Sequence, residues 1–274
     1  MSSYSQTVFK YSGVQYTGTG NYTAIRSKVL DSQVYSSPLG IEIDTAGRIY
    51  ITNEHNIFLL FNGKSKLMAG YNLDPVDGSD YKNGTGIASR FSQPAGIAVN
   101  RSTNSMVIVD MGNNLIRSLS PYLNSFTDET AGFIAGTKSF VGGWADGAVA
   151  TAKFNVPDGV AVNTNGDIYV SDRDGHCIRK ISGGNVTTIA GTHGTSGNKD
   201  GTGIAATFMN PRGLYLESST SLLVADYGNQ RIRRINLTTN AVTTVISSGL
   251  DGPSDLCVVN GQMYITDLLS VKKY

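Results

Sequence analysis

The chain has 274 residues, enough to bury a large hydrophobic core in one domain or two. It carries 22 Lys and Arg against 21 Asp and Glu, a formal net charge of +1, so no overall field attracts nucleic acid or an anionic membrane. With 32 Gly, 7 Pro and 16% charged residues, the composition suits short strands joined by tight turns and excludes a mainly helical or a disordered protein.

The first 20 residues contain two strand-like segments, at 7–13 and 14–20, and the second is rich in Thr. No apolar stretch approaches the ~18 residues of a membrane span, and the N-terminus lacks the apolar core of a signal peptide. We therefore expect no membrane insertion and, for the sequence as it stands, a cytoplasmic protein. Removal of a signal peptide from a longer precursor would instead make it extracellular. Five Asn-x-Ser/Thr sequons fit that alternative, or arise by chance in an Asn-, Thr- and Ser-rich chain: Asn21, Asn83, Asn100, Asn185 and Asn236.

From residue 35 onward one pattern recurs, and its clearest copy spans residues 154–191. An aromatic residue is followed by Pro-x-Gly and a short apolar strand, then by an Asn-Gly turn and a second strand that ends in Asp172. An Ile-Arg-Lys-Ile strand and a Thr-rich strand ending in Ala-Gly complete the copy. Related copies open at residues 35–41, 91–100, 208–214 and 252–256.

Five prolines anchor the copies: Pro38, Pro94, Pro157, Pro211 and Pro253. The shortest spacing is close to the ~40–45 residues of one four-stranded propeller blade, and the longer spacings add loops. A single blade cannot bury both faces of its sheet. Consecutive blades must therefore stack, and the ring must close.

These residues resemble the NHL repeat family, including the linking turns at residues 77–78, 146–147 and 200–201. The resemblance covers nearly the whole chain and implies an all-β fold, a single β-propeller domain over residues 1–274 with four-stranded antiparallel blades. The first copy departs most from the pattern. Asn53 replaces the Asp that ends the second strand, and residues 58–61 replace the Arg-bearing strand.

The sequence contains five repeat units, whereas NHL propellers usually have six blades. The chain ends at residues 270–274, within a third strand, so the fifth unit lacks its outer strand. We predict that the N-terminal strand within residues 1–20 fills this place and closes the ring, which removes open sheet edges. The alternatives are a fragment of a longer propeller and an arc completed by another chain.

A zinc-dependent lyase is one enzyme class that uses this fold, and the resemblance places its zinc-binding histidines directly after the strand-opening prolines. Those positions hold no His; they are Leu39, Ala95, Asp158, Arg212 and Ser254. The three histidines, His55, His176 and His193, fall on three separate loops. We therefore expect no metal, no cofactor and no catalytic residues.

Other polar residues recur because the repeat recurs. We expect the strand-end aspartates (Asp110, Asp172, Asp226 and Asp267) to bind turn amides of their own blade, not to act as acid–base pairs or calcium ligands. His176 shares its position with Asn114 and Gln230, where a polar residue holds a turn. Cys177 and Cys257 lie in different units and are expected to be buried thiols.

Some NHL propellers bind single-stranded RNA on a basic face. The basic residues here lie mostly in the third strands, and we interpret them as solvated strand faces spread around the rim; they are Arg117, Arg179, Lys180, Arg231, Arg233 and Arg234. In residues 178–181 the alternation predicts apolar side chains toward the neighbouring blade and charged ones toward water.

We therefore predict a non-enzymatic binding or scaffolding propeller that contacts its partner, expected to be a protein, through loops on one face of the disc. The binding candidates are the five residues that follow the anchoring prolines, around the central channel, and Trp144, the only Trp. Trp144 is either a binding hot spot or a cover for the blade beneath it. The alternatives are a hydrolase or lyase that uses Asp158 and Arg212 at the channel mouth, single-stranded RNA binding, and a small-molecule ligand at the channel.

Overall fold

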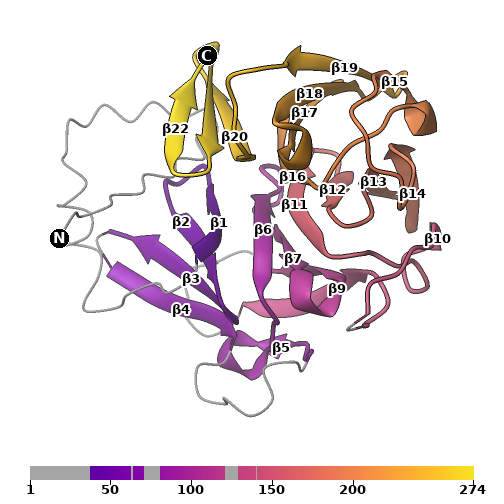
Figure 1. Ribbon diagram of the computed structural model, residues 1–274. Coiled ribbons are helices and arrows are strands. Elements are labelled where there is room, and N and C mark those ends of the chain that lie inside the picture. The colour runs from indigo at the N-terminus through magenta and orange to yellow at the C-terminus, as the bar shows by residue number, and fades with distance from the viewer. Residues whose placement is uncertain (1–37, 63, 71–80, 121–128, 140) are drawn as a thin grey trace.

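The chain is folded almost entirely into β-sheet. The structure, a computed structural model, describes residues 38–62, 64–70, 81–120, 129–139 and 141–274. In this part of the chain the strands form five antiparallel sheets, which follow one another around a ring from indigo to yellow in Figure 1. Each sheet is one blade of a β-propeller, as predicted, and the described helical segments are short 3-10 turns.

The first strand of each blade lies nearest the ring axis, and the next strands pair antiparallel in order toward the rim. Blade 1 contains β1 (Pro38–Ile43), β2 (Ile49–Asn53), β3 (Asn56–Phe61) and β4 (Lys64–Gly70). Blade 2 contains β6 (Pro94–Val99), β7 (Met106–Asp110), β8 (Leu115–Leu119) and β9 (Thr130–Ala135). Blade 3 contains β11 (Pro157–Val162), β12 (Ile168–Asp172), β13 (Cys177–Ser182) and β14 (Asn185–Ala190). Blade 4 contains β16 (Pro211–Ser218), β17 (Ser221–Asp226), β18 (Arg231–Asn236) and β19 (Ala241–Ile246), and blade 5 contains β20 (Pro253–Val259), β21 (Gln262–Asp267) and β22 (Ser270–Lys273).

Blades 2, 3 and 4 each carry one additional short strand at the rim. These strands are β5 (Gly84–Thr85), β10 (Gly147–Ala148) and β15 (Gly201–Thr202), and they pair with the outer strands β9, β14 and β19. Blade 5 has three strands among the described residues, which agrees with the prediction that the fifth unit lacks its own outer strand.

All five predicted prolines begin an innermost strand, where a missing N–H group is tolerated. The glycine two residues later allows consecutive inner strands to meet. A Cβ atom on Gly40, Gly96 or Gly159 would lie 2.2, 2.6 or 2.3 Å from the carbonyl oxygen of Ala95, Asp158 or Arg212 on the next blade, respectively. The hub is therefore packed backbone against backbone.

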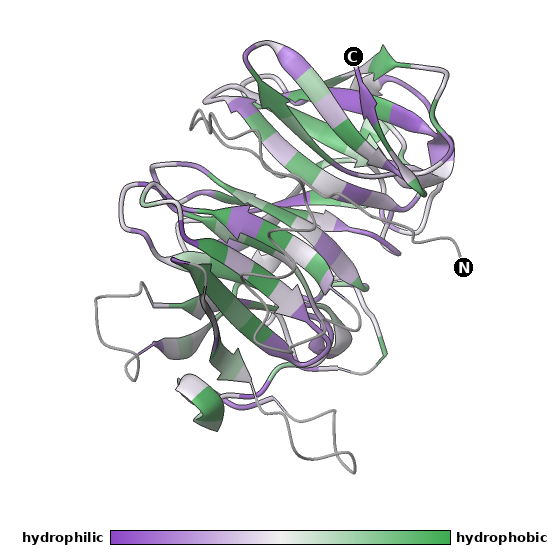
Figure 2. Ribbon diagram, turned by 90° about the vertical axis from the view of Figure 1, so that its left-hand side faces the viewer, coloured by the Kyte–Doolittle hydropathy of each residue, from purple (hydrophilic) through white to green (hydrophobic). Residues whose placement is uncertain are grey.

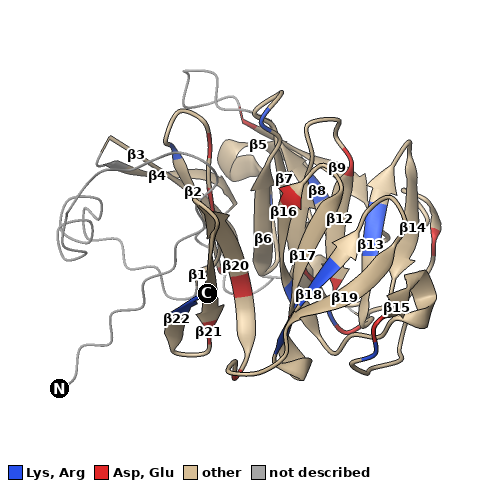
Figure 3. Ribbon diagram, turned by 90° about the horizontal axis from the view of Figure 1, so that it is seen from above, with Lys and Arg blue, Asp and Glu red and all other residues tan. Residues whose placement is uncertain are grey.

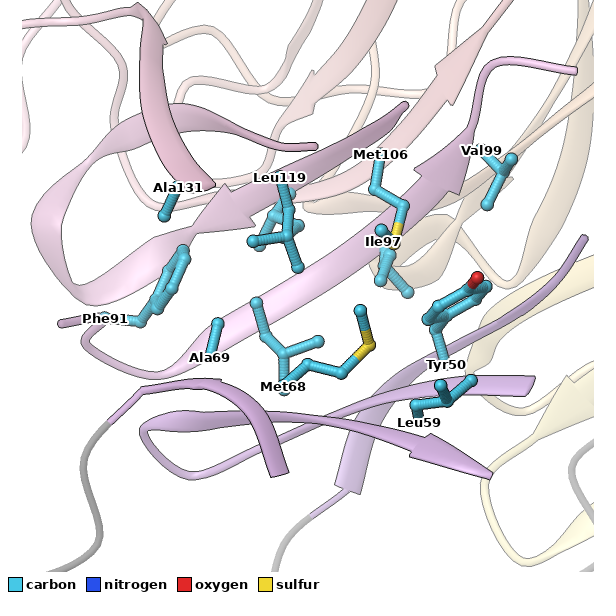
Figure 4. Packing of buried hydrophobic residues seen from close by; sticks show 12 residues of the cluster. Tyr50, Leu59, Met68, Ala69, Phe91, Ile97, Val99, Met106, Leu119 and Ala131 are labelled. Carbon is cyan, nitrogen blue, oxygen red and sulfur yellow. The ribbon is translucent and has the colours of Figure 1, made fainter. Parts of the chain in front are cut away.

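Side chains between neighbouring blades form the core. Tyr50, Leu59 and Met68 of blade 1 pack against Ile97 and Met106 of blade 2 (Figure 4). Blades 2, 3 and 4 each pack against a neighbouring blade on both faces, and many of their strand residues are hydrophobic (Figure 2). Cys177 and Cys257 are buried free thiols, as expected.

The prediction that the basic residues of the third strands face water is wrong for Arg117, Arg179 and Arg233, which are completely buried. These arginines lie on β8, β13 and β18, whose basic positions are blue in Figure 3. Alternate residues of these strands face the two neighbouring blades, and the side that carries the three arginines is buried. Lys180 is partly exposed and forms an ion pair with Asp167 at 2.9 Å.

Each buried arginine forms an ion pair with the strand-end aspartate of its own blade. The Nη1–Oδ2 distance is 2.9 Å in all three blades; the pairs are Arg117–Asp110, Arg179–Asp172 and Arg233–Asp226. The other carboxylate oxygen accepts a backbone N–H from the turn that precedes the inner strand, as in the 2.6 Å bond from Asn155 to Asp172. The predicted role of these aspartates in binding turn amides of their own blade is therefore correct.

The two end blades lack this arginine pair. Asn53 and Phe58 occupy the corresponding positions of blade 1, judged by their pairing with Pro38 and Ile51. In blade 5, Asp267 instead binds the ammonium group of Lys272 at 2.6 Å. In blade 1 both members of the ion pair are therefore replaced, the aspartate by Asn53 and the arginine by Phe58.

The turn between the second and third strands links each inner blade to the next one. Asn114, His176 and Gln230 all adopt left-handed conformations, with φ of 55°, 57° and 57°. The Asn114 side chain accepts the N–H of Val156 at 2.7 Å, and His176 Nδ1 accepts the N–H of Asn210 at 3.1 Å. His176 therefore has a structural role, as predicted.

The packing between successive inner strands is not repeated between β20 and β1. Ile51, Phe58 and Leu60 lie on the face of blade 1 that is turned away from blade 2. Among the described residues, they cluster with other residues of blade 1. We call this place the seam. The predicted closing strand within residues 1–20 lies outside the described residues, so the predicted closure stays a prediction.

Candidate functional site

One face of the propeller carries the starts of all five inner strands and the turns between the second and third strands. The two features lie together because the first residue of each inner strand pairs with the last residue of the second strand, as Pro157 does with Asp172. We call this the turn face. The predicted binding residues that follow the prolines are on it.

These five residues differ in what they offer a ligand. Leu39 is 56% exposed, whereas the Ala95 methyl group is buried. The Ser254 hydroxyl lies 2.9 Å from the Thr266 hydroxyl of its own blade. Asp158 and Arg212 are the two charged members. They lie on adjacent inner strands that touch where Gly159 meets the Arg212 carbonyl group.

Arg212 is positioned by an aromatic ring. Its guanidinium carbon lies 3.8 Å from the centroid of Tyr227, in a cation–π contact. Its Nε atom is buried without a hydrogen-bond partner. On the side away from Asp158, Gly213 packs against Asp255 of blade 5, so Arg212 lies between two inner strands that each carry a carboxylate.

Asp158 is partly desolvated at the same place, with its side chain 22% exposed. Desolvation raises the pKa of its carboxyl group, and the positive charges of Arg212 and Arg173 oppose that rise. Its Oδ2 atom is 3.5 Å from Arg173 Nη1, whereas Arg173 Nε binds Asp174 more closely, at 2.9 Å. We call Asp158 and Arg212 the axis pair.

Sequence reasoning missed Arg173, Tyr227 and Asp255. Arg173 and Tyr227 directly follow the strand-end aspartates of blades 3 and 4, in the position that Met111 has in blade 2. Arg173 lies 3.9 Å from the Met111 sulfur atom. In blades 3 and 4, the residue after the strand-end Asp therefore contacts the residue after the proline, a position that the repeat pattern could have identified.

Trp144 lies at the rim of blade 3. Its ring stacks on His193, with centroids 5.5 Å apart and an interplanar angle of 28°, and the residue is 49% exposed. The Gly194 N–H binds the Gly175 carbonyl at 3.0 Å, which ties the His193 loop to the turn that contains Arg173. Burial, with Arg179 and His176 nearby, lowers the pKa of His193, so its imidazole is neutral near pH 7. We call Trp144 and His193 the rim stack.

The axis pair and the rim stack belong to one connected surface. From Asp158 the contacts run through Arg173 to Asp174, whose Oδ1 atom also accepts a hydrogen bond from Asn210 at 3.3 Å. The turn then continues through Gly175 to the His193 loop and Trp144. The surface offers a charged centre and an aromatic edge.

Metal binding, RNA binding and membrane insertion each have less structural support. Within the described ranges no three His, Cys, Asp or Glu side chains converge as a metal site would require. Three of the arginines counted for RNA binding are buried in ion pairs. The same part of the chain contains no helix that is long and apolar enough to cross a bilayer.

Residues 154–181, the core of the clearest repeat, match the NHL repeat family model. The chain therefore contains an NHL repeat within a β-propeller. Among curated proteins, Protein SUPPRESSOR OF QUENCHING 1, chloroplastic, from Arabidopsis thaliana is 27% identical over 235 residues, which cover 80% of this chain and 21% of the relative. NHL repeat-containing protein 2 from Homo sapiens is 27% identical over 161 residues, which cover 57% and 22%. The chain therefore spans about a fifth of the length of these relatives.

Solved structures with the same fold have diverse activities. An auxiliary nutrient binding protein from Bacteroides ovatus aligns with a TM-score of 0.59 at 12% identity, covering 89% of this chain and 60% of the other. A chain of the nidogen/laminin complex aligns at 0.58 and 17%, covering 86% and 74%. Virginiamycin B lyase from Staphylococcus aureus aligns at 0.54 and 13%, covering 90% and 86%. At these identities the likeness concerns the fold alone.

Proposed function

We propose that this NHL propeller is a binding or scaffolding module whose protein partner docks on the turn face, with the rim stack as its anchor. The observation that carries the proposal is the half-exposed Trp144, held flat against His193. An exposed Trp on a rigid support is typical of binding hot spots, because it buries a large area with little loss of conformational freedom.

Two further observations support this face. Val141, three residues before Trp144 in the sequence, is 80% exposed and adds an exposed apolar side chain to this segment. The axis pair provides charged groups farther in, so a partner could meet an apolar edge and a polar centre together. The hydrolase or lyase alternative would use the axis pair itself, but the contacts of Asp158 and Arg212 do not favour one reaction class.

Site-specific photo-crosslinking tests the proposal. A photoreactive residue at Val141 should capture a partner from an extract of the source cells, and the same residue at the exposed Thr164, in the turn between β11 and β12 at the opposite ends of these strands, should not. The captured protein is then purified and titrated. Trp144→Ala should weaken its binding by at least about tenfold, as expected for a hot spot. Equal capture from both positions, or unchanged affinity, would contradict docking on the turn face.

A further inference from the structure

The axis pair is separate from the rim stack and has chemistry of its own. We infer that it binds a ligand that carries both a carboxylate and a cationic group, with the carboxylate on Arg212 and the cation on Asp158. This site goes beyond the proposed docking of a protein at the rim, and the two are tested by different variants.

Arg212 is prepared to receive a carboxylate. Its guanidinium group is held against Tyr227 and makes no hydrogen bond to any described residue. Its Nε atom is buried without an acceptor, as are those of Arg179 and Arg233. What distinguishes Arg212 from those two arginines is that its guanidinium group has no carboxylate ion pair among the described residues. A carboxylate pairs with a guanidinium group through two parallel hydrogen bonds, which the terminal nitrogens of Arg212 can donate.

Asp158 has acceptor capacity to spare. Among the described residues its one ion-pair contact is the long 3.5 Å approach of Arg173, whose closer partner is Asp174. Its side chain is partly exposed, so a ligand ammonium or guanidinium group can reach it. Because Gly159 packs against the Arg212 carbonyl, the two inner strands that carry the pair are fixed relative to each other.

The balance of charge favours a ligand with both signs. Arg173 approaches Asp158 on one side. On the other side of Arg212, the Asp255 carboxylate lies against Gly213, and its negative charge also acts on Asp158. These two carboxylates and two guanidinium groups carry no net charge. Asp174 lies beyond Arg173 and is 40% exposed, so solvent screens its charge. A ligand with a single charge would unbalance this partly desolvated group, whereas a zwitterion would not.

Titration with small probes tests the inference. The zwitterions glycine, β-alanine, 4-aminobutyrate and 6-aminohexanoate measure the span between the two groups, and acetate and methylammonium supply each charge alone. The readouts are calorimetry and the NMR signal of the Arg212 Nε–Hε group, assigned by its loss in Arg212→Lys. One zwitterion should bind at least about tenfold more tightly than acetate or methylammonium. A blocked peptide, N-acetyl-Lys-Asp-amide, then separates a peptide source from a free amino acid.

Conservative variants decide the outcome. Asp158→Asn and Arg212→Lys, with melting temperatures measured alongside, should each abolish the preference for the zwitterion. Arg234→Gln, which removes a partly exposed arginine paired with Glu217 on blade 4, should not, and neither should Trp144→Ala. The inference is overturned if acetate binds as tightly as every zwitterion, if binding survives Asp158→Asn, or if no probe binds below about 10 mM. Loss of a protein partner in Trp144→Ala with zwitterion binding intact would separate the two proposals.

Discussion

Arg179 and Asp172 lie completely buried in blade 3, with Nη1 and Oδ2 2.9 Å apart. Burial raises the pKa of Asp172 to about 6, and Arg179 together with the N–H of Asn155 opposes the rise. The guanidinium group also binds the carbonyl oxygens of Lys153 and Ala145, so it joins the blade to the segments that precede its inner strand. The pair is a structural element of the repeat and offers nothing to a ligand.

Breaking this pair should destabilise the protein strongly. Asp172→Asn or Arg179→Phe alone should lower the free energy of unfolding by about 3 kcal/mol, because each leaves a buried polar group without its partner. The double variant reproduces the Asn53 and Phe58 combination of blade 1 and should lose less than the sum of the two single losses. Urea denaturation measures all four proteins, and additive losses would contradict the coupling.

The hub should not accept a methyl group. In Gly159→Ala the new Cβ atom would lie 2.3 Å from the Arg212 carbonyl oxygen, so blades 3 and 4 would have to separate. We expect a loss of about 1–3 kcal/mol, typical of overpacking. Gly143→Ala is the matched control, because its Cβ atom would meet only the Lys153 side chain, at 3.1 Å. Equal melting temperatures for the two variants would argue against backbone packing at the hub.

Blade 5 should contribute to stability in a way that depends on pH. Burial alone would raise the pKa of Asp267, but the hydrogen bonds from Lys272 and from the N–H groups of Gly252 and Asp251 outweigh burial, so its pKa is lowered below 3.8. A carboxyl group with a lowered folded pKa stabilises the fold above its unfolded pKa and loses that effect as pH falls through the folded value.

The variant Asp267→Asn should therefore be less stable than wild type at pH 7, and the difference should shrink below about pH 3.8. Urea unfolding at a series of pH values measures this. The control is Asp251→Asn, because the Asp251 side chain is 74% exposed and 3.7 Å from Lys272. A difference that stays constant down to pH 3 would show that the charge of Asp267 is not what stabilises the blade.

Deletion of residues 1–20 tests closure at the seam. If these residues supply the outer strand of blade 5, their removal should lower the melting temperature markedly, because an edge strand and its backbone hydrogen bonds would be lost. Calorimetry of the full chain and the shortened chain is sufficient. An unchanged melting temperature would point to one of the other two arrangements, a longer propeller or an arc completed by a second chain.

Much of the fold could be predicted because the repeat carries it. The anchoring prolines located all five inner strands, four of them within Pro-x-Gly. The shared position of Asn114, His176 and Gln230 identified a turn residue where a single His would have suggested a metal ligand. The buried state of Arg179 was missed because the alternation of residues 178–181 was interpreted as one dry and one wet face. Arg179 is buried instead, and the Asp172 carboxylate and nearby carbonyl oxygens replace water as its hydrogen-bond partners.

The candidate site was only half predictable. Asp158 and Arg212 were identifiable as the charged residues after the prolines. Tyr227 was not, because its importance depends on a contact with Arg212 that forms across one blade. Trp144 was recognised as unusual, but its stacking on His193 joins two loops almost 50 residues apart, a distance that no local pattern spans.

Because the hub glycines let the inner strands meet backbone to backbone, the arrangement of the blades does not depend on the side chains that contact a ligand. Since blade spacing at the axis is set by main-chain contact, the side chain that precedes each glycine can change without altering where its neighbours stand. Four residues hold this position before a hub glycine, and their side chains range from a methyl group to a guanidinium group; they are Leu39, Ala95, Asp158 and Arg212. A change in the side chain after an anchoring proline can therefore change the ligand preference without a change in the arrangement of the blades.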